Sequence, residues 1–168
     1  MNLQKPVIIG LINPKSPLNV GAVMRAAGCY QATAVRYSGE RFGRAAKYNT
    51  DTKDVKSRVP LTHMNNLLDD LPVDVEVVCV EFVEGAVPLP SFVHPQRALY
   101  IFGPEDGSIA QDLIDKAGSV VFVPTIGCMN LAATVNVVLY DRLVKSGAQR
   151  DDNELIKSSR DINNRLKI

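Results

Sequence analysis

The sequence lacks the features that usually mark secreted, membrane and metal-binding proteins. Its three cysteines, Cys29, Cys79 and Cys128, are far apart, odd in number and without C-x-x-C spacing. Neither a disulfide framework nor a zinc site is therefore expected, and Cys29 and Cys79 are expected to be buried thiols. No apolar run is long enough to cross a bilayer, and the start is not charged-then-apolar as in a signal peptide. We therefore expect no metal site, no membrane contact and a cytoplasmic protein.

The fingerprints of two common enzyme classes are also missing. No Gly-rich G-x-G-x-x-G segment follows the first apolar run, which disfavours a dinucleotide-binding fold. The serines lack the G-x-S-x-G setting of a hydrolase nucleophile. His63 and His94 each lie near a proline and a loop, so we expect surface or capping histidines and assign neither to catalysis.

Apolar runs alternate with helical patterns along the 168 residues, a length that suits one domain with a well-buried core. The expected strands are Val7–Ile12, Ala32–Tyr37, Val75–Val80, Ala98–Phe102 and Ser119–Val123. The expected helices are Leu18–Ala27, Thr62–Leu68, Ala110–Lys116 and Asn130–Ser146, with Gly28, Gly118 and Gly147 as stops. This alternation predicts an α/β fold, a parallel sheet with helices on both faces. We expect residues 1–168 to form a single domain in which residues 150–168 are a C-terminal helical tail, with a short polar helix over Asp152–Leu166.

Three of the expected strands end abruptly in polar or Gly/Pro-rich turns. These turns are Asn13–Gly21 after the first strand, Gly103–Gly107 after the fourth and Pro124–Asn130 after the fifth. Because the carboxyl ends of parallel strands share one edge of a sheet, the turns are expected to meet there. Open α/β folds bind their ligands at that edge.

The motifs in these turns resemble those of the SpoU/TrmH branch of the SPOUT class of RNA methyltransferases. The N-x-G-x-x-x-R segment is Asn19–Arg25, the F-G-P-E turn is Phe102–Glu105, and the closing segment is Pro124–Leu131. Their order and their positions after predicted strands make the resemblance specific. The third turn is shorter than is usual in the family and carries Cys128 where a serine is common.

The resemblance implies methylation of an RNA ribose 2′-hydroxyl by S-adenosylmethionine, in a minimal, single-domain member. It also implies a C-terminal deep trefoil knot, an exception to the general absence of knots, and a homodimer. A chain this short leaves no room for the extra RNA-recognition domain of many ribosomal RNA members, so tRNA is the expected substrate. Two alternatives remain open: a non-catalytic RNA-binding or ribosome-assembly factor on the same fold, and a base methyltransferase of the same class.

Site roles also follow from the resemblance, tempered by physical chemistry. The matching arginine, Arg25, acts on the substrate hydroxyl from across the dimer interface, and Asn19, Glu105 and Asn130 hold the turns and substrate in register. Because an arginine side chain keeps its proton at ordinary pH, we expect Arg25 to orient the phosphate and hydroxyl and to stabilise developing negative charge. Glu105 is expected to accept backbone N–H bonds. The expected cofactor-binding residues are Val80, Gly103, Val123, Ile126, Cys128 and Met129.

Charge is unevenly distributed, although the net charge is only +1. Residues 1–60 hold ten Lys/Arg against three Asp/Glu, and residues 61–168 hold nine against fifteen. Cations between residues 36 and 58 are interleaved with Tyr37, Phe42 and Tyr48, a pattern that can neutralise phosphates and stack on unpaired bases. The alternative is a solvated loop with a few core aromatics. The expected RNA-binding residues are Arg36, Arg41, Arg44 and Lys47.

Overall fold

A computed structural model describes residues 5–46, 59–147 and 151–168 of the chain. It contains a seven-stranded sheet of order β3-β2-β1-β6-β4-β7-β5, in which every pairing is parallel. The strands are β1 (Val7–Ile12), β2 (Ala34–Ser38), β3 (Leu61–His63), β4 (Glu76–Val80), β5 (Val87–Pro88), β6 (Ala98–Phe102) and β7 (Ser119–Phe122). The expected parallel α/β sheet is confirmed.

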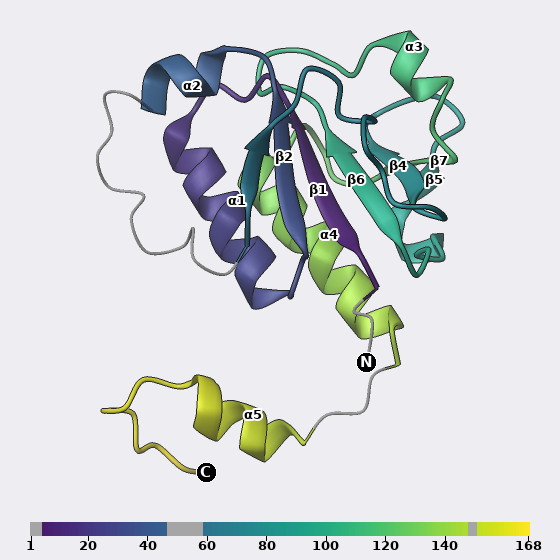
Figure 1. Ribbon diagram of the computed structural model, residues 1–168. Coiled ribbons are helices and arrows are strands. Elements are labelled where there is room, and N and C mark those ends of the chain that lie inside the picture. Colours follow the sequence, from purple (N-terminus) through teal and green to yellow (C-terminus); the bar gives the residue numbers. More distant parts are fainter. Residues whose placement is uncertain (1–4, 47–58, 148–150) are drawn as a thin grey trace.

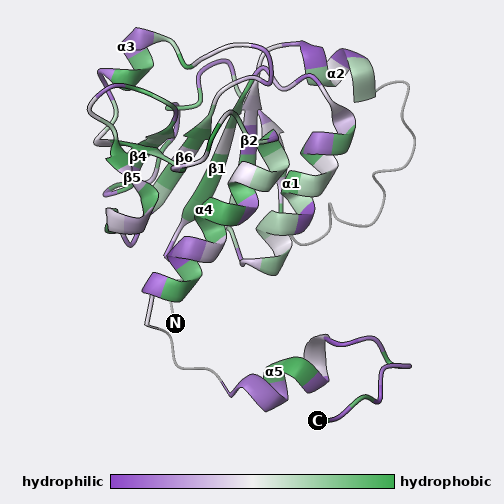
Figure 2. Cartoon of the chain, turned by 180° about the vertical axis from the view of Figure 1, so that it is seen from behind, coloured by the Kyte–Doolittle hydropathy of each residue, from purple (hydrophilic) through white to green (hydrophobic). Residues whose placement is uncertain are grey.

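The helices are α1 (Pro17–Cys29), α2 (Arg41–Ala46), α3 (Gln111–Ile114), α4 (Leu131–Lys145), α5 (Asp152–Ser159) and the 3₁₀ turn η1 (Leu89–Ser91). Helices α1 and α4 pack side by side on one face of the sheet (Figure 1), and Figure 2 views that face from outside. Ser16 caps α1 by accepting the Asn19 N–H, and Pro17 occupies its first turn. Asn130 caps α4 through the N–H groups of Ala132 and Ala133.

Side chains of β1 and β6 alternate between two apolar cores, one on each face of the sheet. The larger core joins Ile9 and Tyr100 of the sheet to α1 and α4. The other core contains Ile8 and Leu99, and it is covered by α3 and residues 64–71. The second face is thus covered by one short helix and irregular chain.

The prediction of a helix at Thr62–Leu68 is wrong. Residues 61–63 instead extend the sheet as β3, paired with β2, and residues 65–70 form turns. The Arg36 guanidinium donates hydrogen bonds to the carbonyls of Leu67, Asp69 and Asp70. Only the first of these carbonyls lies within the expected helix. Asp70, two residues beyond it, has a positive φ of 50°.

Several smaller expectations also need correction. Helix α1 runs through Gly28 to Cys29, and the left-handed residue that follows is Gln31. Cys29 is exposed, whereas Cys79 is buried as expected. The polar helix expected to reach Leu166 ends at Ser159. His94 is not a surface histidine, because its side chain is only 4% exposed.

Within the described ranges, no helix is long and apolar enough to cross a membrane. The same residues contain no group of three or more His, Cys, Asp or Glu side chains that could hold a metal ion.

Candidate functional site

The three motif-bearing turns meet at the carboxyl edge of the sheet, as the sequence predicts. Adjacent strands β1 and β6 bring the first two turns together. The Glu105 carboxylate accepts hydrogen bonds from the backbone N–H groups of Lys15, at 2.8 Å, and Ser16, at 3.1 Å. The expectation that Glu105 accepts backbone N–H bonds is confirmed. The Glu105 carboxylate therefore fixes the start of α1 against the turn after β6.

Two asparagines extend this contact to the third turn. Asn19 Nδ2 donates to Glu105 Oε1 at 3.1 Å, and Asn130 Nδ2 donates to Asn19 Oδ1 at 3.0 Å. The Asn130 side chain also accepts the first N–H groups of α4. Glu105, Asn19 and Asn130 therefore form one chain of hydrogen bonds, which we call the edge network. It joins the three motifs in space.

A pocket lies beside the edge network, at the carboxyl ends of β4, β6 and β7. Five of the six residues expected to bind the cofactor line it: Val80, Gly103, Val123, Cys128 and Met129. Ile126 does not, because it is fully exposed on the third turn and outside the pocket lining. Among the remaining lining residues, Phe82 and Phe122 form a tilted ring pair with centroids 5.9 Å apart. The walls are therefore largely apolar.

Glu81 is a lining residue that the sequence reasoning missed. Its carboxylate accepts the N–H of Phe82 at 2.9 Å and the N–H of Ile109 at 3.0 Å. A Cβ atom added at Gly103 would lie 3.2 Å from Glu81 Oε2 and 3.4 Å from Ile109 Cγ1. Glycine at 103 therefore lets the β6 turn pack against the end of β4. Glu81 is the first polar residue after the apolar run ending at Val80, so the strand-end criterion used for the other turns could have found it.

The electrostatics of this edge favour ionised carboxylates. Burial alone would raise the pKa of Glu105, but hydrogen bonds from Lys15, Asn19 and Ser16 outweigh it and leave that pKa below its ordinary value. The neighbouring Asp106 also has a lowered pKa, chiefly because Arg41 donates hydrogen bonds to it. Both carboxylates are therefore charged near neutral pH.

Arg25 lies apart from the pocket. It is six residues after Asn19 on α1, a rise of about 9 Å along the helix axis, and it does not line the pocket. Its side chain is exposed, and no hydrogen bond or ion pair to it is found among the described residues.

The four residues expected to bind RNA differ in whether their side chains already have hydrogen-bond partners. Arg36 is held by the carbonyls of residues 67–70, so its donors are already occupied. Arg41 binds Asp106 in a bidentate pair, and Arg44 is exposed on α2. Lys47 lies outside the described residues. The half-buried Tyr37 ring packs edge-on against the buried Phe42.

A family model provides the assignment that the motifs anticipate. The model of the SpoU rRNA Methylase family matches residues 6–140, which include all three motifs and the pocket. The chain belongs to this family. The resemblance is confirmed, and the match ends within α4, before the tail that contains α5.

Solved structures show the same fold at low sequence identity. The SpoU methyltransferase AviRb from Streptomyces viridochromogenes, crystallised with AdoMet, has a TM-score of 0.69 and 17% identity, covering 88% of this chain and 60% of that chain. The A. aeolicus TrmH/SpoU tRNA modifying enzyme has a TM-score of 0.69 and 15% identity, covering 92% of this chain and 80% of that chain. A structure described as giving insights into 2-OH methylation of C/U34 on tRNA has a TM-score of 0.68 and 20% identity, covering 85% and 97%.

This chain thus spans less than two thirds of the AviRb chain but nearly the full length of the structure concerned with C/U34. No curated protein matches the sequence.

Proposed function

We propose that the protein transfers a methyl group from S-adenosylmethionine to a ribose 2′-hydroxyl of RNA, with tRNA as its preferred substrate. The observation that carries the proposal is the edge network, in which Glu105, Asn19 and Asn130 join the three motifs beside an apolar pocket. Family membership supports methylation of RNA. The 97% coverage of the structure concerned with tRNA position 34 supports the preference for tRNA.

The residues of the pocket suit an adenosine-containing cofactor. Val80, Val123 and Met129 supply apolar walls, and the missing side chain at Gly103 leaves the turn backbone close to the cavity. When bound, S-adenosylmethionine supplies the methyl group. The pocket and the edge network hold the two reactants in line, which removes much of the entropic barrier to transfer.

Arg25 is the proposed catalytic residue. Its guanidinium orients the phosphate and hydroxyl of the substrate and stabilises negative charge that develops on the ribose oxygen. The oxygen forms its bond to the methyl carbon as the carbon–sulfur bond breaks. The hydroxyl proton passes to solvent or to the phosphate, because arginine does not accept it at ordinary pH.

The active unit that we propose is a homodimer in which Arg25 serves the pocket of the partner subunit. Arg25 lies outside the pocket of its own subunit, on an exposed face of α1 that also carries Leu18. Helix α4, which packs against α1, also exposes Val137, Tyr140 and Val144, and exposed apolar side chains are common at interaction surfaces.

A mixture of two inactive variants tests the shared site. Arg25→Ala keeps the pocket, and Gly103→Val keeps Arg25 but crowds Glu81 and Ile109. In a mixed dimer the intact pocket meets the intact Arg25. Random exchange should therefore restore about a quarter of the parent activity. Inactive mixtures, despite demonstrated subunit exchange, would reject the shared site.

Two alternatives are separated from this function by direct assays. Calorimetry with S-adenosylhomocysteine distinguishes the enzyme from a non-catalytic RNA-binding factor, because only the enzyme needs that pocket. Incubation with total tRNA and labelled S-adenosylmethionine, followed by nucleoside analysis, distinguishes a 2′-O-methylated ribose from a methylated base. Label in a base would reject the ribose assignment. The trefoil knot, the single-domain assignment and the cytoplasmic location stay predictions.

A further inference from the structure

The turn after β6 and helix α2 are joined by an ion pair outside the edge network. Arg41 Nη1 donates to Asp106 Oδ1 at 2.7 Å, and Nη2 donates to Asp106 Oδ2 at 2.9 Å. The Lys15 ammonium lies 4.0 Å from Asp106 Oδ2. Two cations from the β1 and β2 loops therefore converge on one carboxylate beside the pocket, since Glu105 and Gly107 on either side of Asp106 both line it.

The backbone holds these cations in register. The Arg41 N–H donates to Asn13 Oδ1 at 3.4 Å. The Asn13 side chain also lies where a Cβ atom of residue 39 would be, so only glycine fits at that position. Gly39 has a φ of 77°, a left-handed conformation that favours glycine. Asn13 thus packs the loop after β1 against the loop after β2, and this contact positions Arg41 beside the turn after β6.

A phosphate fits this arrangement as well as a carboxylate does. The guanidinium fork makes two parallel hydrogen bonds to either group, and a phosphate has a further oxygen with which to engage Lys15. Asp106 is 53% exposed, so it returns to water at little cost when it is displaced. Glu105 keeps its own bonds to Lys15 N and Ser16 N throughout, because those donors are backbone groups.

We propose that Lys15 and Arg41 form a binding site for a backbone phosphate of the RNA substrate, and that Asp106 occupies this site in the free protein. The inference rests on the proposed function for the presence of RNA at this edge. Asp106 competes with the incoming phosphate, so RNA must displace it to dock beside the pocket. The carboxylate thereby weakens the binding of RNA that offers no other contacts.

Four variants test the competition. Asp106→Asn removes the competing charge, and Glu40→Gln is the matched control, since it removes an equal charge one residue from Arg41 without a bond to that side chain. Arg41→Ala removes the guanidinium, and the double variant Arg41→Ala/Asp106→Asn completes a double-mutant cycle for the pair. Filter binding of labelled total tRNA at several salt concentrations gives affinity, and thermal melting verifies that each variant is folded.

The expected result is specific to the pair. Asp106→Asn should raise tRNA affinity roughly twofold to fivefold above Glu40→Gln, the range of an exposed ion pair. Arg41→Ala should lower affinity and reduce the salt slope by about 0.7 to 0.9. In the Arg41→Ala background, Asp106→Asn should raise tRNA affinity no more than Glu40→Gln raises that of the parent. Affinity for S-adenosylhomocysteine should stay unchanged.

Equal gains from Asp106→Asn and Glu40→Gln would overturn the inference, as would a gain that persists without Arg41. A loss of affinity in Asp106→Asn would overturn it too, because the pair would then support the RNA surface. Failure of the proposed function has a different signature. If the parent binds tRNA with this pattern of variants but transfers no methyl group, the phosphate site stands and the enzymatic assignment falls.

Discussion

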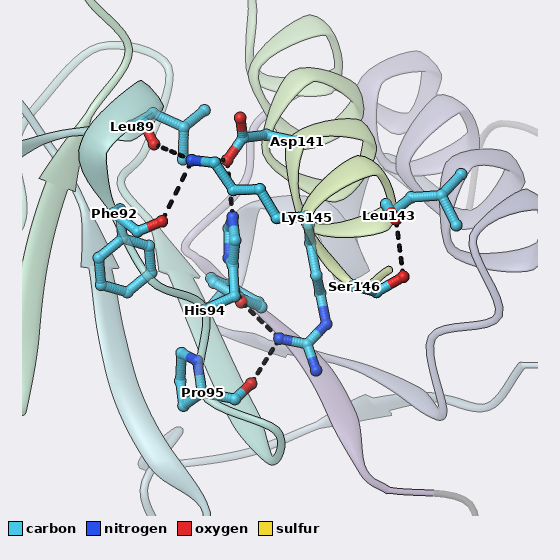
Figure 3. A network of polar contacts seen from close by, with 10 residues as sticks. Leu89, Phe92, His94, Pro95, Asp141, Leu143, Lys145 and Ser146 are labelled. Carbon is cyan, nitrogen blue, oxygen red and sulfur yellow. Dashed lines mark hydrogen bonds and ion pairs between the residues drawn. The ribbon is translucent and has the colours of Figure 1, made fainter. Parts of the chain in front are cut away.

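Helix α4 is held at its two ends by polar networks that differ in burial. At its N-terminus, Asn130 belongs to the edge network, whose residues Glu105 and Asn130 are exposed beside the pocket. Toward its C-terminus, Asp141, Arg142 and Lys145 bind His94, Tyr100 and backbone carbonyls of residues 89–96 (Figure 3). We call this second set the core network. None of its residues lines the pocket.

The core network satisfies its buried groups internally. The ionised Asp141 can only accept, so His94 Nε2 donates to it, and Nδ1 of the neutral ring accepts from the Tyr100 hydroxyl. That hydroxyl accepts from Arg142 at 2.9 Å. Burial, opposed by Asp141, lowers the pKa of His94, and burial raises the pKa of Tyr100 to about 12. Both groups are therefore neutral. The core network ties α4 to β6, whereas the edge network leaves its polar groups open to a ligand.

The difference teaches that similar hydrogen bonds have different consequences. Bonds in the exposed network are in exchange with water and contribute little to stability, but they set the geometry of the site. At the buried Tyr100 hydroxyl and His94 ring of the core network, water cannot replace a lost bond, so its loss leaves an unsatisfied group and lowers stability. Variants of the two networks should therefore separate activity from folding.

The largest effect should follow from Asn19→Ala in the edge network. This change removes the link between Glu105 and Asn130 and lets the turns drift, and a misplacement of about 1 Å costs roughly 10²-fold in rate. Methyl transfer to total tRNA should fall by about that factor, while the melting temperature barely changes. A folded variant of parental activity would show that the edge network does not position the reactants.

Tyr100→Phe should show the opposite pattern in the core network. Loss of the hydroxyl leaves His94 Nδ1 without its partner and removes one of the hydrogen bonds of Arg142, which keeps the carbonyls of Pro95 and Gln96. We expect a cost of about 1 to 3 kcal/mol in the free energy of unfolding. Tyr30→Phe is the control, since no hydrogen bond to the Tyr30 hydroxyl is found in the described part of the chain. Denaturant unfolding gives the stability, and calorimetry should show unchanged S-adenosylhomocysteine affinity. Equal stability of the two variants would remove the distinction between the networks.

Glu105→Gln should lower the free energy of unfolding by less than about 1 kcal/mol at neutral pH, because solvent screens this exposed group. The sign of its pH dependence follows from the lowered pKa of Glu105. Its stabilisation is present above the ordinary value of 4.5 and is lost as pH falls through the lower folded value. The difference between parent and variant, measured by urea unfolding from pH 7 to 3, should therefore shrink on acidification. A constant difference would show that the carboxylate charge is not involved.

The smallest effect should come from Cys128→Ser in the third turn. Cys128 lines the pocket and is exposed, and no hydrogen bond to its thiol is found among the described residues. Replacement by the serine that is common in the family should change S-adenosylhomocysteine affinity by less than about twofold, as for most surface substitutions. A larger change in calorimetry would give the thiol a direct role in binding.

The meeting of the three turns at the carboxyl edge of the sheet was predictable, because each turn is marked by residues that are close together in the sequence. Each motif follows an apolar run, and parallel strands bring their carboxyl ends together whatever their order in the sheet. Glu105 was expected to accept backbone N–H bonds, and the structure supplies two donors, Lys15 and Ser16, from the turn after β1. The helix expected at Thr62–Leu68 is absent because its first residues belong to β3 and pair with β2, a strand that is distant in the sequence.

The sequence by itself determined the alternation of strands and helices, the family and the three turns that carry its motifs, because these depend on periodicity and on residues close together in the chain. Only the tertiary structure decided which distant groups meet. Arg41 reaches Asp106 across 65 positions, and His94 reaches Asp141 across 47. The first contact depends on the order of the strands and the second on the position of α4. No local pattern encodes either arrangement, because burial is a property of the whole fold.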